Sequence, residues 1–219
     1  MPTPSTDRLP SRPWRGVSAD DRVADRRERL LQAGLEVFGT VGYAGGTVAD
    51  VCATAGLTRR YFYAAFANRE ALLLAVAERI VDDAFAALAP ELRDLDRGVE
   101  AVARDAFGAF VAALVDDPRR ARVLLVETVG VGPEFEERRR ELLRRLSDLF
   151  RDAGRAILGD AAPPPLDTEL TARALMGAAI ELLVAHVRGE IVVERAQLVA
   201  HLSRIFDRAA PVTSTPEAP

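Results

Sequence analysis

Apolar residues along most of the chain recur at the three- and four-residue spacing of amphipathic helices. Leu30, Gly34, Val37 and Phe38 share one face of a first helix, which the glycine-rich stretch 39–46 ends. Ala, Leu, Arg and Glu dominate the composition, and these side chains lose little freedom in a helix. The pattern predicts an all-α fold of about nine helices.

Two short helices are predicted directly after the first. Thr47 precedes an apolar series and has Asp50 three residues on, so a capped helix begins there and stops at Gly56. A second short helix opens at Thr58 and would bury Leu57, Phe62 and Phe66. Asn68 then caps a longer helix, whose inward residues are Leu72, Leu73, Val76 and Ile80.

The C-terminal half contains longer helices. One carries Val102, Phe110 and Leu114 on a single face and is broken at 116–118, before a shorter helix through about Thr128. A long helix follows the break at 130–133 and ends at Gly159. From Thr168 to Val187 apolar residues occupy nearly the whole circumference, which predicts burial on more than one side. A final amphipathic helix carries Leu198, Leu202, Ile205 and Phe206.

The order of these segments predicts two domains between two tails. Residues 21–82 form an N-terminal three-helix unit with a helix-turn-helix motif at 47–66, and residues 83–210 form a larger helical domain. Residues 1–20 and 211–219 are polar and rich in Pro, Ser and Thr, and are expected to be disordered.

Charge is unevenly distributed between the two parts. The net charge of −4 argues against a protein that coats nucleic acid without specificity. Through Glu70, however, ten arginines face eight acidic residues, a balance of +2, whereas the rest of the chain carries −6. Contact with DNA is therefore expected in the N-terminal part.

The stretch 47–72 reads TVADVCATAGLTRRYFYAAFANREAL. Its capping Thr, its Ala-Gly-Leu turn, the pair Tyr63 and Phe66, and the Asn-Arg-Glu-Ala-Leu run resemble the DNA-binding signature of the TetR family of transcriptional regulators. The resemblance covers about Asp25 to Ile80. It implies a homodimeric regulator that binds a palindromic operator and answers to a small molecule in its C-terminal domain.

The same residues suit DNA recognition without the family name. A helix whose first turn enters the major groove needs short polar or forked donors there, and Thr58, Arg59, Arg60 and Tyr61 supply them. Backbone phosphates are within reach of three further positions, which are Thr47, Tyr63 and Arg69. Two positions depart from the family pattern: Arg60 replaces a commonly small residue, and Ala65 stands where a polar residue is frequent.

Each of these assignments has a structural alternative. Arg59 and Arg60 could form a solvated face, although we favour groove contact, and Tyr61 is open between core and groove. Phe62 and Phe66 are assigned to the core, as is Cys52, whose burial would suppress thiol reactivity. Arginines at positions 8, 12 and 15 could enter a minor groove, but a solvated tail is the favoured interpretation.

The last two helices are predicted to build the dimer interface, with ordinary core helices as the alternative. Polar groups among apolar ones in the C-terminal half are candidates to line an effector cavity. The candidate effector-binding residues are Phe107, Phe110, Glu127, Thr128, Met176, Glu181 and His186.

The motifs of several other protein classes are not apparent. With one Cys and two His, neither a zinc site nor a Cys-His nucleophile is indicated, and no glycine-rich phosphate loop follows a strand. No uninterrupted apolar run has membrane-spanning length. We therefore expect a cytoplasmic protein without cofactor or metal. We favour a repressor over an activator, because occupancy alone occludes a promoter whereas activation needs a contact with the polymerase. The alternatives are a helical interaction module without DNA binding and, least favoured, a helical enzyme.

Overall fold

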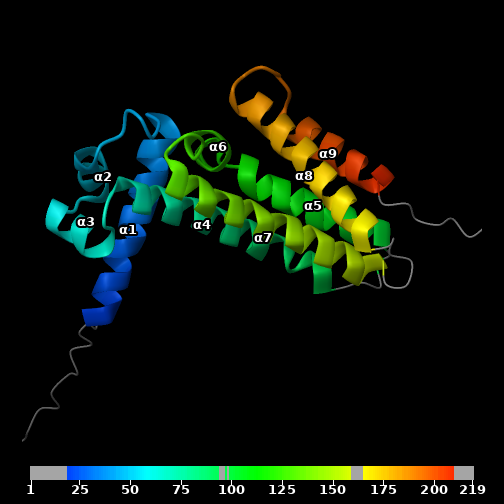
Figure 1. Cartoon of the computed structure of the whole chain (residues 1–219), viewed down its shortest axis with the longest axis horizontal. Coiled ribbons are helices and arrows are strands. Elements are labelled where there is room, and N and C mark those ends of the chain that lie inside the picture. Colours follow the sequence, from blue (N-terminus) through cyan, green and yellow to red (C-terminus); the bar gives the residue numbers. More distant parts are fainter. Residues whose placement is uncertain (1–18, 94–96, 98, 159–164, 210–219) are drawn as a thin grey trace, which may run out of the picture.

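The computed structural model describes residues 19–93, 97, 99–158 and 165–209, and in this part of the chain every regular element is a helix. The predicted all-α fold is thus confirmed. The predicted tails lie outside the described residues, except that Ala19 and Asp20 already belong to the first helix. Figure 1 shows a small group of helices at one end and a longer bundle extending from it.

The small group contains α1 (Ala19–Thr40), α2 (Val48–Ala55) and α3 (Arg59–Ala65), and α4 (Arg69–Leu88) leads from it into the bundle. The predicted capping box at the start of α2 is present, because the Thr47 hydroxyl accepts from the Asp50 N–H and the Asp50 carboxylate accepts from the Thr47 N–H. Gly56 ends α2 in the left-handed conformation at φ 61°, which glycine adopts without strain. Asn68 caps α4 by accepting the Ala71 N–H at 2.7 Å, as predicted.

The bundle contains α5 (Val99–Val115), α6 (Pro118–Arg122), α7 (Pro133–Leu158), α8 (Pro165–Val187) and α9 (Arg195–Ala209). A short 3-10 turn, Glu91–Arg93, follows α4. The predicted helix through Thr128 is only partly α-helical, because α6 gives way to a π-helix at Val123–Glu127. Glu127, at the end of this π-helix, accepts the N–H of Tyr43 in the loop between α1 and α2.

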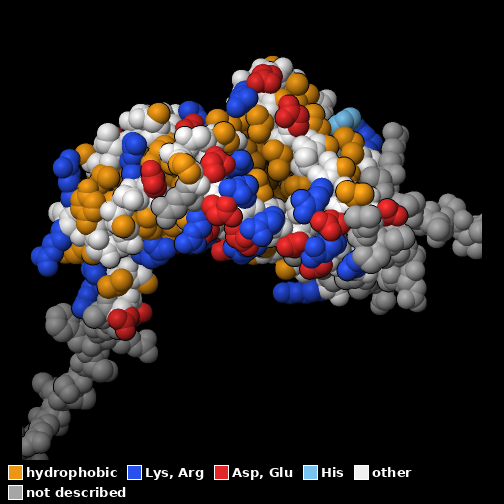
Figure 2. Space-filling view, viewed as in Figure 1, with side chains coloured by type: hydrophobic (Ala, Val, Ile, Leu, Met, Phe, Trp, Pro, Cys, Tyr) orange, Lys and Arg blue, Asp and Glu red, His pale blue; other side chains and the backbone are white. Residues whose placement is uncertain are grey.

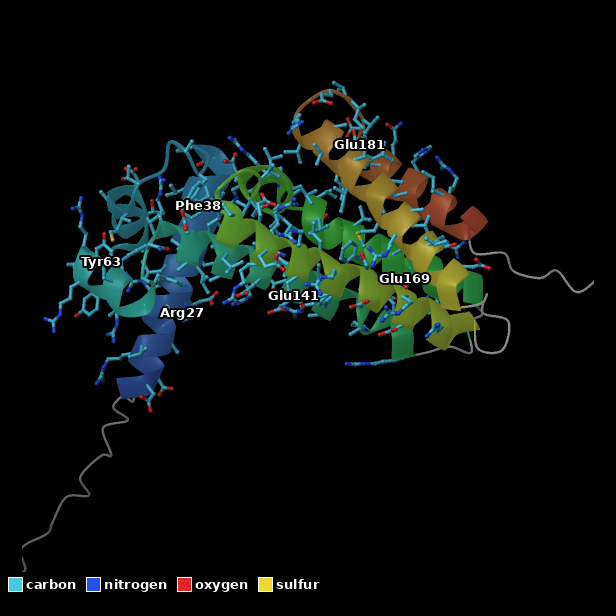
Figure 3. All side chains as sticks on the ribbon, viewed as in Figure 1. Arg27, Phe38, Tyr63, Glu141, Glu169 and Glu181 are labelled. Atoms are coloured by element: carbon cyan, nitrogen blue, oxygen red, sulfur yellow. The ribbon has the colours of Figure 1, made fainter. Side chains whose placement is uncertain are left out.

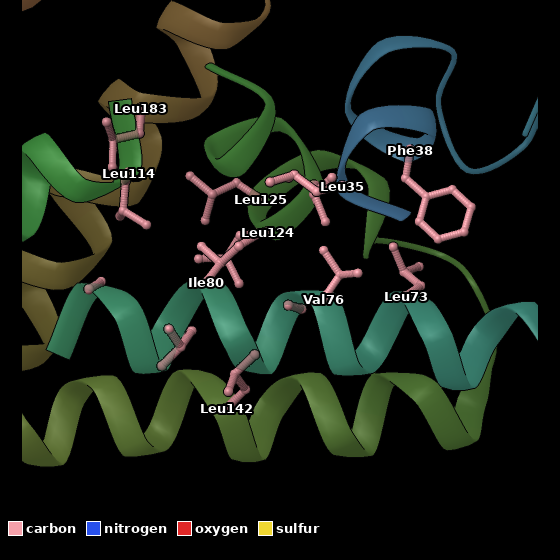
Figure 4. Close-up of a cluster of buried hydrophobic side chains, with 14 of the residues drawn as sticks. Leu35, Phe38, Leu73, Val76, Ile80, Leu114, Leu124, Leu125, Leu142 and Leu183 are labelled. Atoms are coloured by element: carbon pink, nitrogen blue, oxygen red, sulfur yellow. The ribbon is translucent and has the colours of Figure 1, made fainter. Parts of the chain in front are cut away.

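The hydrophobic core is continuous from the small group into the bundle. Figure 4 shows α4 at its centre, with Leu73, Val76 and Ile80 facing Phe38 of α1 and Leu124 of the π-helix. All five side chains are nearly or fully buried. The inward residues predicted for α4 are thereby confirmed, and the two parts of the chain share one core.

Helix α8 is not buried on all sides within this chain. Met176, Ala179 and Leu183 are buried, whereas Leu170 is 56% exposed and the small residues at 174, 177 and 178 are exposed. Within the described residues, the segment Glu169–Val187 is long and apolar enough to cross a membrane by length and composition, which the sequence pattern had not led us to expect. Arg173 and Glu181 interrupt it, and it packs along one side against α6 and α7.

Candidate DNA-binding surface and effector domain

Helix α3 has one buried side and one strongly exposed side. Phe62 is fully buried and contacts Phe66 at 6.1 Å between ring centres, which confirms both as core residues. Arg59 and Arg60 are exposed and form no ion pair with any described residue. Figure 2 shows arginine side chains protruding at the end of the molecule that α3 occupies. The free cationic side of α3 can therefore meet an anionic partner.

The two tyrosines of α3 lie on the same exposed side. Tyr61 is 41% exposed and Tyr63 is 58% exposed, so neither belongs to the core. Figure 3 shows Tyr63 at the outer edge of α3. Thr58 caps α3 by its extended backbone, but its side chain makes no capping hydrogen bond. Its hydroxyl and both phenols are thus available for a partner outside the chain.

Thr47 and Arg69 have roles within the protein. The Thr47 hydroxyl donates to the Asp50 carboxylate at 2.6 Å, and this hydrogen bond is the main reason why the pKa of Asp50 lies below its usual range. Arg69 donates to the backbone carbonyls of Tyr43 and Gly46, and its guanidinium lies 4.3 Å from the Tyr43 ring centre. Arg69 therefore secures the loop between α1 and α2, a role that the sequence pattern does not reveal.

Three arginines of α1 also contact the helix-turn-helix, and sequence reasoning missed them. Arg29 donates to the carbonyl of Ala55 at 2.6 Å, while Arg26 and Arg27 lie over aromatic rings of α3 and its end. Their signal in the sequence is a cluster of arginines just before Leu30. Nothing in that cluster indicates partners some thirty residues away.

Cys52 is buried, as predicted. It is 5% exposed on the inner side of α2, and burial raises the pKa of its thiol above the ordinary value. The thiolate is the reactive form, so this cysteine is a poor nucleophile at neutral pH.

A polar junction joins α1 to the bundle. Arg119 of α6 binds both Asp117 and Glu36, and its hydrogen bond is the main cause that holds the pKa of Asp117 below the usual range. Glu127 accepts the Tyr43 N–H at 2.7 Å and the Arg122 Nε–H at 2.9 Å.

Close backbone packing supports this junction. Arg122 also donates to the carbonyl of Thr40 at 3.0 Å. A Cβ atom at Gly39 would lie 2.5 Å from the Arg119 Cβ, so only glycine allows α1 and α6 to approach this closely.

The structure separates the candidate effector-binding residues into several places. Phe107 and Phe110 of α5, Met176 of α8 and Thr128 are buried in the bundle, and the Thr128 hydroxyl donates to the Leu124 carbonyl at 2.7 Å. Glu127 lies at the junction described above.

The other two candidates lie on α8. Glu181 is exposed, and Figure 3 shows it toward the outer end of that helix. His186 lines a hollow of about 390 Å³ with residues of α1 and α6, and its Nδ1 atom is buried without a hydrogen-bond partner among the described residues. In the same part of the chain, no group of three or more His, Cys, Asp or Glu side chains is placed to hold a metal ion.

Residues 30–76 match the family model described as bacterial regulatory proteins, tetR family. No curated protein matches the chain. Among solved structures, the fatty acid degradation regulator FadR from Bacillus halodurans is 20% identical with a TM-score of 0.70, over 83% of this chain and 94% of that one.

Two further structures give the same picture. FadR from Bacillus subtilis in complex with stearoyl-CoA is 16% identical with a TM-score of 0.69, over 83% of this chain and 98% of that one. A tetR-family regulatory protein from Rhodococcus RHA1 is 20% identical with a TM-score of 0.66, over 84% and 96%. Residues 30–76 therefore match the DNA-binding domain of the tetR family of bacterial regulatory proteins, and the chain shares the fold of solved tetR-family regulatory proteins over most of its length.

Proposed function

We propose that this protein is a homodimeric repressor that binds a palindromic operator through α3 and leaves it when a small molecule occupies the C-terminal domain. The observation that carries the DNA-binding part is the exposed side of α3. It offers two guanidinium groups that form no ion pair within the described part of the chain, together with two phenols, on a helix held in place by Phe62. Arg can bind a guanine edge through two hydrogen bonds, so Arg59 and Arg60 suit direct base recognition.

Contacts outside the bases come from neighbouring residues. Thr58 at the start of α3 and Tyr63 near its end face away from the core and can bind backbone phosphates. Thr47 and Arg69 are weaker candidates for binding backbone phosphates, because their polar groups already form hydrogen bonds within the protein.

The exposed side of α8 and α9 supports a dimer. A groove of about 730 Å³ between them is lined mainly by apolar and small side chains, including Leu182, Ile191, Val193, Ala196 and Ala200. Hydrophobic side chains gather beside α8 in Figure 2. A second copy of the chain related by a two-fold axis would cover this side with its own α8 and α9. Such a dimer would account for the apolar character of α8 without any contact with a membrane.

The junction between α1 and the bundle gives a route from effector to operator. Glu127 and Arg122 bond to the segment 40–43 just before α2, and the π-helix that carries Glu127 adjoins the core of the bundle. A ligand that moves this π-helix would shift α1 and hence the two copies of α3. A coupling of about 1–3 kcal/mol is enough to change operator occupancy.

The effector is proposed to bind among Phe107, Phe110 and Met176 in the core of the bundle. The complex of Bacillus subtilis FadR with stearoyl-CoA makes long-chain acyl-CoA esters the first compounds to try. The TetR-family fold is that of transcriptional regulators rather than enzymes, so the assay to apply is DNA release and not turnover.

The test is selection of bound sequences from a random pool of DNA duplexes. The proposal predicts an enriched palindrome with half-sites about 10 base pairs apart, since two copies of α3 must reach successive major grooves on one face of the duplex. The Arg59→Ala and Arg60→Ala variants should each relax the preference at defined positions. Absence of any enriched sequence at low salt would contradict the proposal and favour a helical protein-interaction module.

A further inference from the structure

Helix α3 has little apolar packing of its own. It is seven residues long, and Phe62 is its one buried side chain among the described residues. So short a helix is not stable in isolation, and its orientation depends on the residues around it. Three arginines of α1, at positions 26, 27 and 29, contact α3, the residue that follows it and the turn before it.

Arg29 and Arg27 bind groups that belong to the framework of the motif. The Arg29 Nη2 donates to the carbonyls of Ala55 at 2.6 Å and Gly56 at 3.3 Å, in the turn between α2 and α3. The Arg27 guanidinium lies 4.5 Å from the ring centre of the buried Phe66. These contacts hold the motif against α1, which Figure 3 shows passing beneath α3 near the labelled Arg27.

Arg26 is different because its partner is exposed. Its guanidinium lies 4.8 Å from the ring centre of Tyr61, within the distance at which a cation and an aromatic face attract one another. Tyr61 is 41% exposed and directly follows Arg59 and Arg60 on α3. Without Arg26 the phenol could turn among several rotamers, since only part of its ring is covered by the protein.

We propose that Arg26 is a positioning residue for operator recognition, which holds the Tyr61 ring so that the phenol contacts one particular base pair. The inference rests on the proposed DNA-binding role of α3. It assigns part of the sequence preference to a side chain that lies outside the helix-turn-helix. A Tyr hydroxyl can donate to or accept from a base edge, and its direction is decided by how the ring is held.

The experiment is a double-mutant cycle on affinity for the selected duplex and for its single-base variants. Arg26→Gln should lower affinity about two- to five-fold, the range expected for an exposed cation–aromatic pair. It should relax the preference at the same base pair as Tyr61→Ala. In the Tyr61→Ala background, Arg26→Gln should have no further effect, whereas Arg26→Lys should retain most of the wild-type affinity because Lys keeps the cation.

Arg22→Gln is the matched control, because it removes the same charge one turn earlier on α1. The fold-change in DNA affinity that it causes should multiply with the fold-change caused by Tyr61→Ala, and it should be the same for the selected duplex and for its single-base variants. If Arg26→Gln behaves in the same way, Arg26 binds a phosphate and the inference is overturned. Circular dichroism melting of each variant shows whether the domain is folded, and Arg26→Lys carries the test if Arg26→Gln unfolds.

The proposed function and this inference fail in different ways. A wild-type chain that selects no sequence overturns both. A wild-type chain that selects a palindrome, with an unchanged preference in Arg26→Gln, overturns only the role of Arg26.

Discussion

Helices α3 and α8 each have an exposed side, and the two exposed sides differ in chemistry. Helix α3 buries one ring and presents arginines and tyrosines, whereas α8 buries a stripe of three apolar residues and presents small and apolar side chains. Charged and phenolic groups lose hydration when covered and need a polar partner in exchange. Small apolar groups gain from being covered by any close-fitting apolar surface.

The difference in chemistry matches the two partners that we propose for these surfaces. A surface of forked donors fits the phosphates and base edges of DNA, and a surface of small side chains lets a second helix approach closely. Helices α3 and α8 lie in different parts of the molecule (Figure 1), and a continuous core connects those parts (Figure 4). Packed side chains and the polar junction of Glu36, Arg119, Arg122 and Glu127 connect the two parts of the molecule.

The largest effect is expected where α3 depends on a single ring. Phe62→Ala should reduce the free energy of unfolding by about 3–5 kcal/mol, because it leaves a cavity under a helix with no other buried side chain in the described structure. The exposed neighbour Tyr63 is the control, since Tyr63→Ala should change stability by less than about 0.5 kcal/mol. Urea denaturation measures both. Equal losses would show that α3 is not anchored as described.

The next largest effect is expected at the opposite surface. Ala178→Glu places a charge on the exposed side of α8 and should convert a dimer to a monomer, with a loss of operator affinity on the order of 100-fold because the two half-sites are no longer linked. Sedimentation velocity and fluorescence anisotropy measure the two quantities. Ala86→Glu on the exposed side of α4 is the matched control. A dimer that survives Ala178→Glu would refute the proposed interface.

A smaller effect is expected at the junction that connects the two surfaces. Glu127→Gln keeps the size of the side chain but removes the charge that strengthens its bonds to Tyr43 and Arg122, and should cost about 1 kcal/mol of stability. It should also reduce the change in DNA affinity caused by an effector. The exposed pair of Glu137 and Arg140 supplies the control, because Glu137→Gln should have almost no effect on unfolding. Equal changes in the free energy of unfolding for Glu127→Gln and Glu137→Gln would show that the junction does not stabilise the protein as described.

The smallest effect is expected in the dependence of protein stability on acidic pH. The pKa of Asp117 is lowered in the folded protein, chiefly by its hydrogen bond with Arg119, so its contribution to stability is present above the ordinary pKa of 3.8 and is lost as the pH falls through the folded value. The free energy of unfolding should therefore decrease less below about pH 4 in Asp117→Asn than in the wild type, by a few tenths of a kcal/mol. The Asn side chain can still cap α6. Urea denaturation at pH 7 and pH 3 tests this, with the more exposed Asp82→Asn for comparison. An unchanged pH dependence would show that this ion pair does not contribute.

The sequence predicts the N-terminal part better than the rest for a physical reason. Caps and turns are local, so Thr47, Gly56 and Asn68 indicate the starts and ends of helices without knowledge of the fold. The exposed side of α3 follows from the same local pattern. Other contacts join residues that are far apart in the sequence. Arg69 and Glu127 form hydrogen bonds with residues 23 and 84 positions away, and Arg26 contacts a ring 35 positions away. No local signal in the sequence indicates these contacts.

The bundle is less predictable because apolar periodicity indicates burial but not the partner. The pattern at α8 predicts burial on more than one side, yet among the described side chains of this helix those buried within one chain are Met176, Ala179 and Leu183. The π-helix at Val123–Glu127 also has no signature distinct from an α-helix in this sequence. For the same reason, polar residues among apolar ones could be named as effector candidates but not placed together.

The central claim is that α3 reads DNA sequence, and one measurement tests it most directly. Fluorescence anisotropy compares the affinity of wild type and of Arg59→Ala for the selected duplex and for a scrambled duplex of equal length, at fixed salt. The account predicts that wild type prefers the selected duplex strongly and that Arg59→Ala loses about 10- to 100-fold on it while binding the scrambled duplex almost as before. Equal losses on both duplexes would mean that Arg59 binds only phosphate, and that α3 does not read the sequence as described.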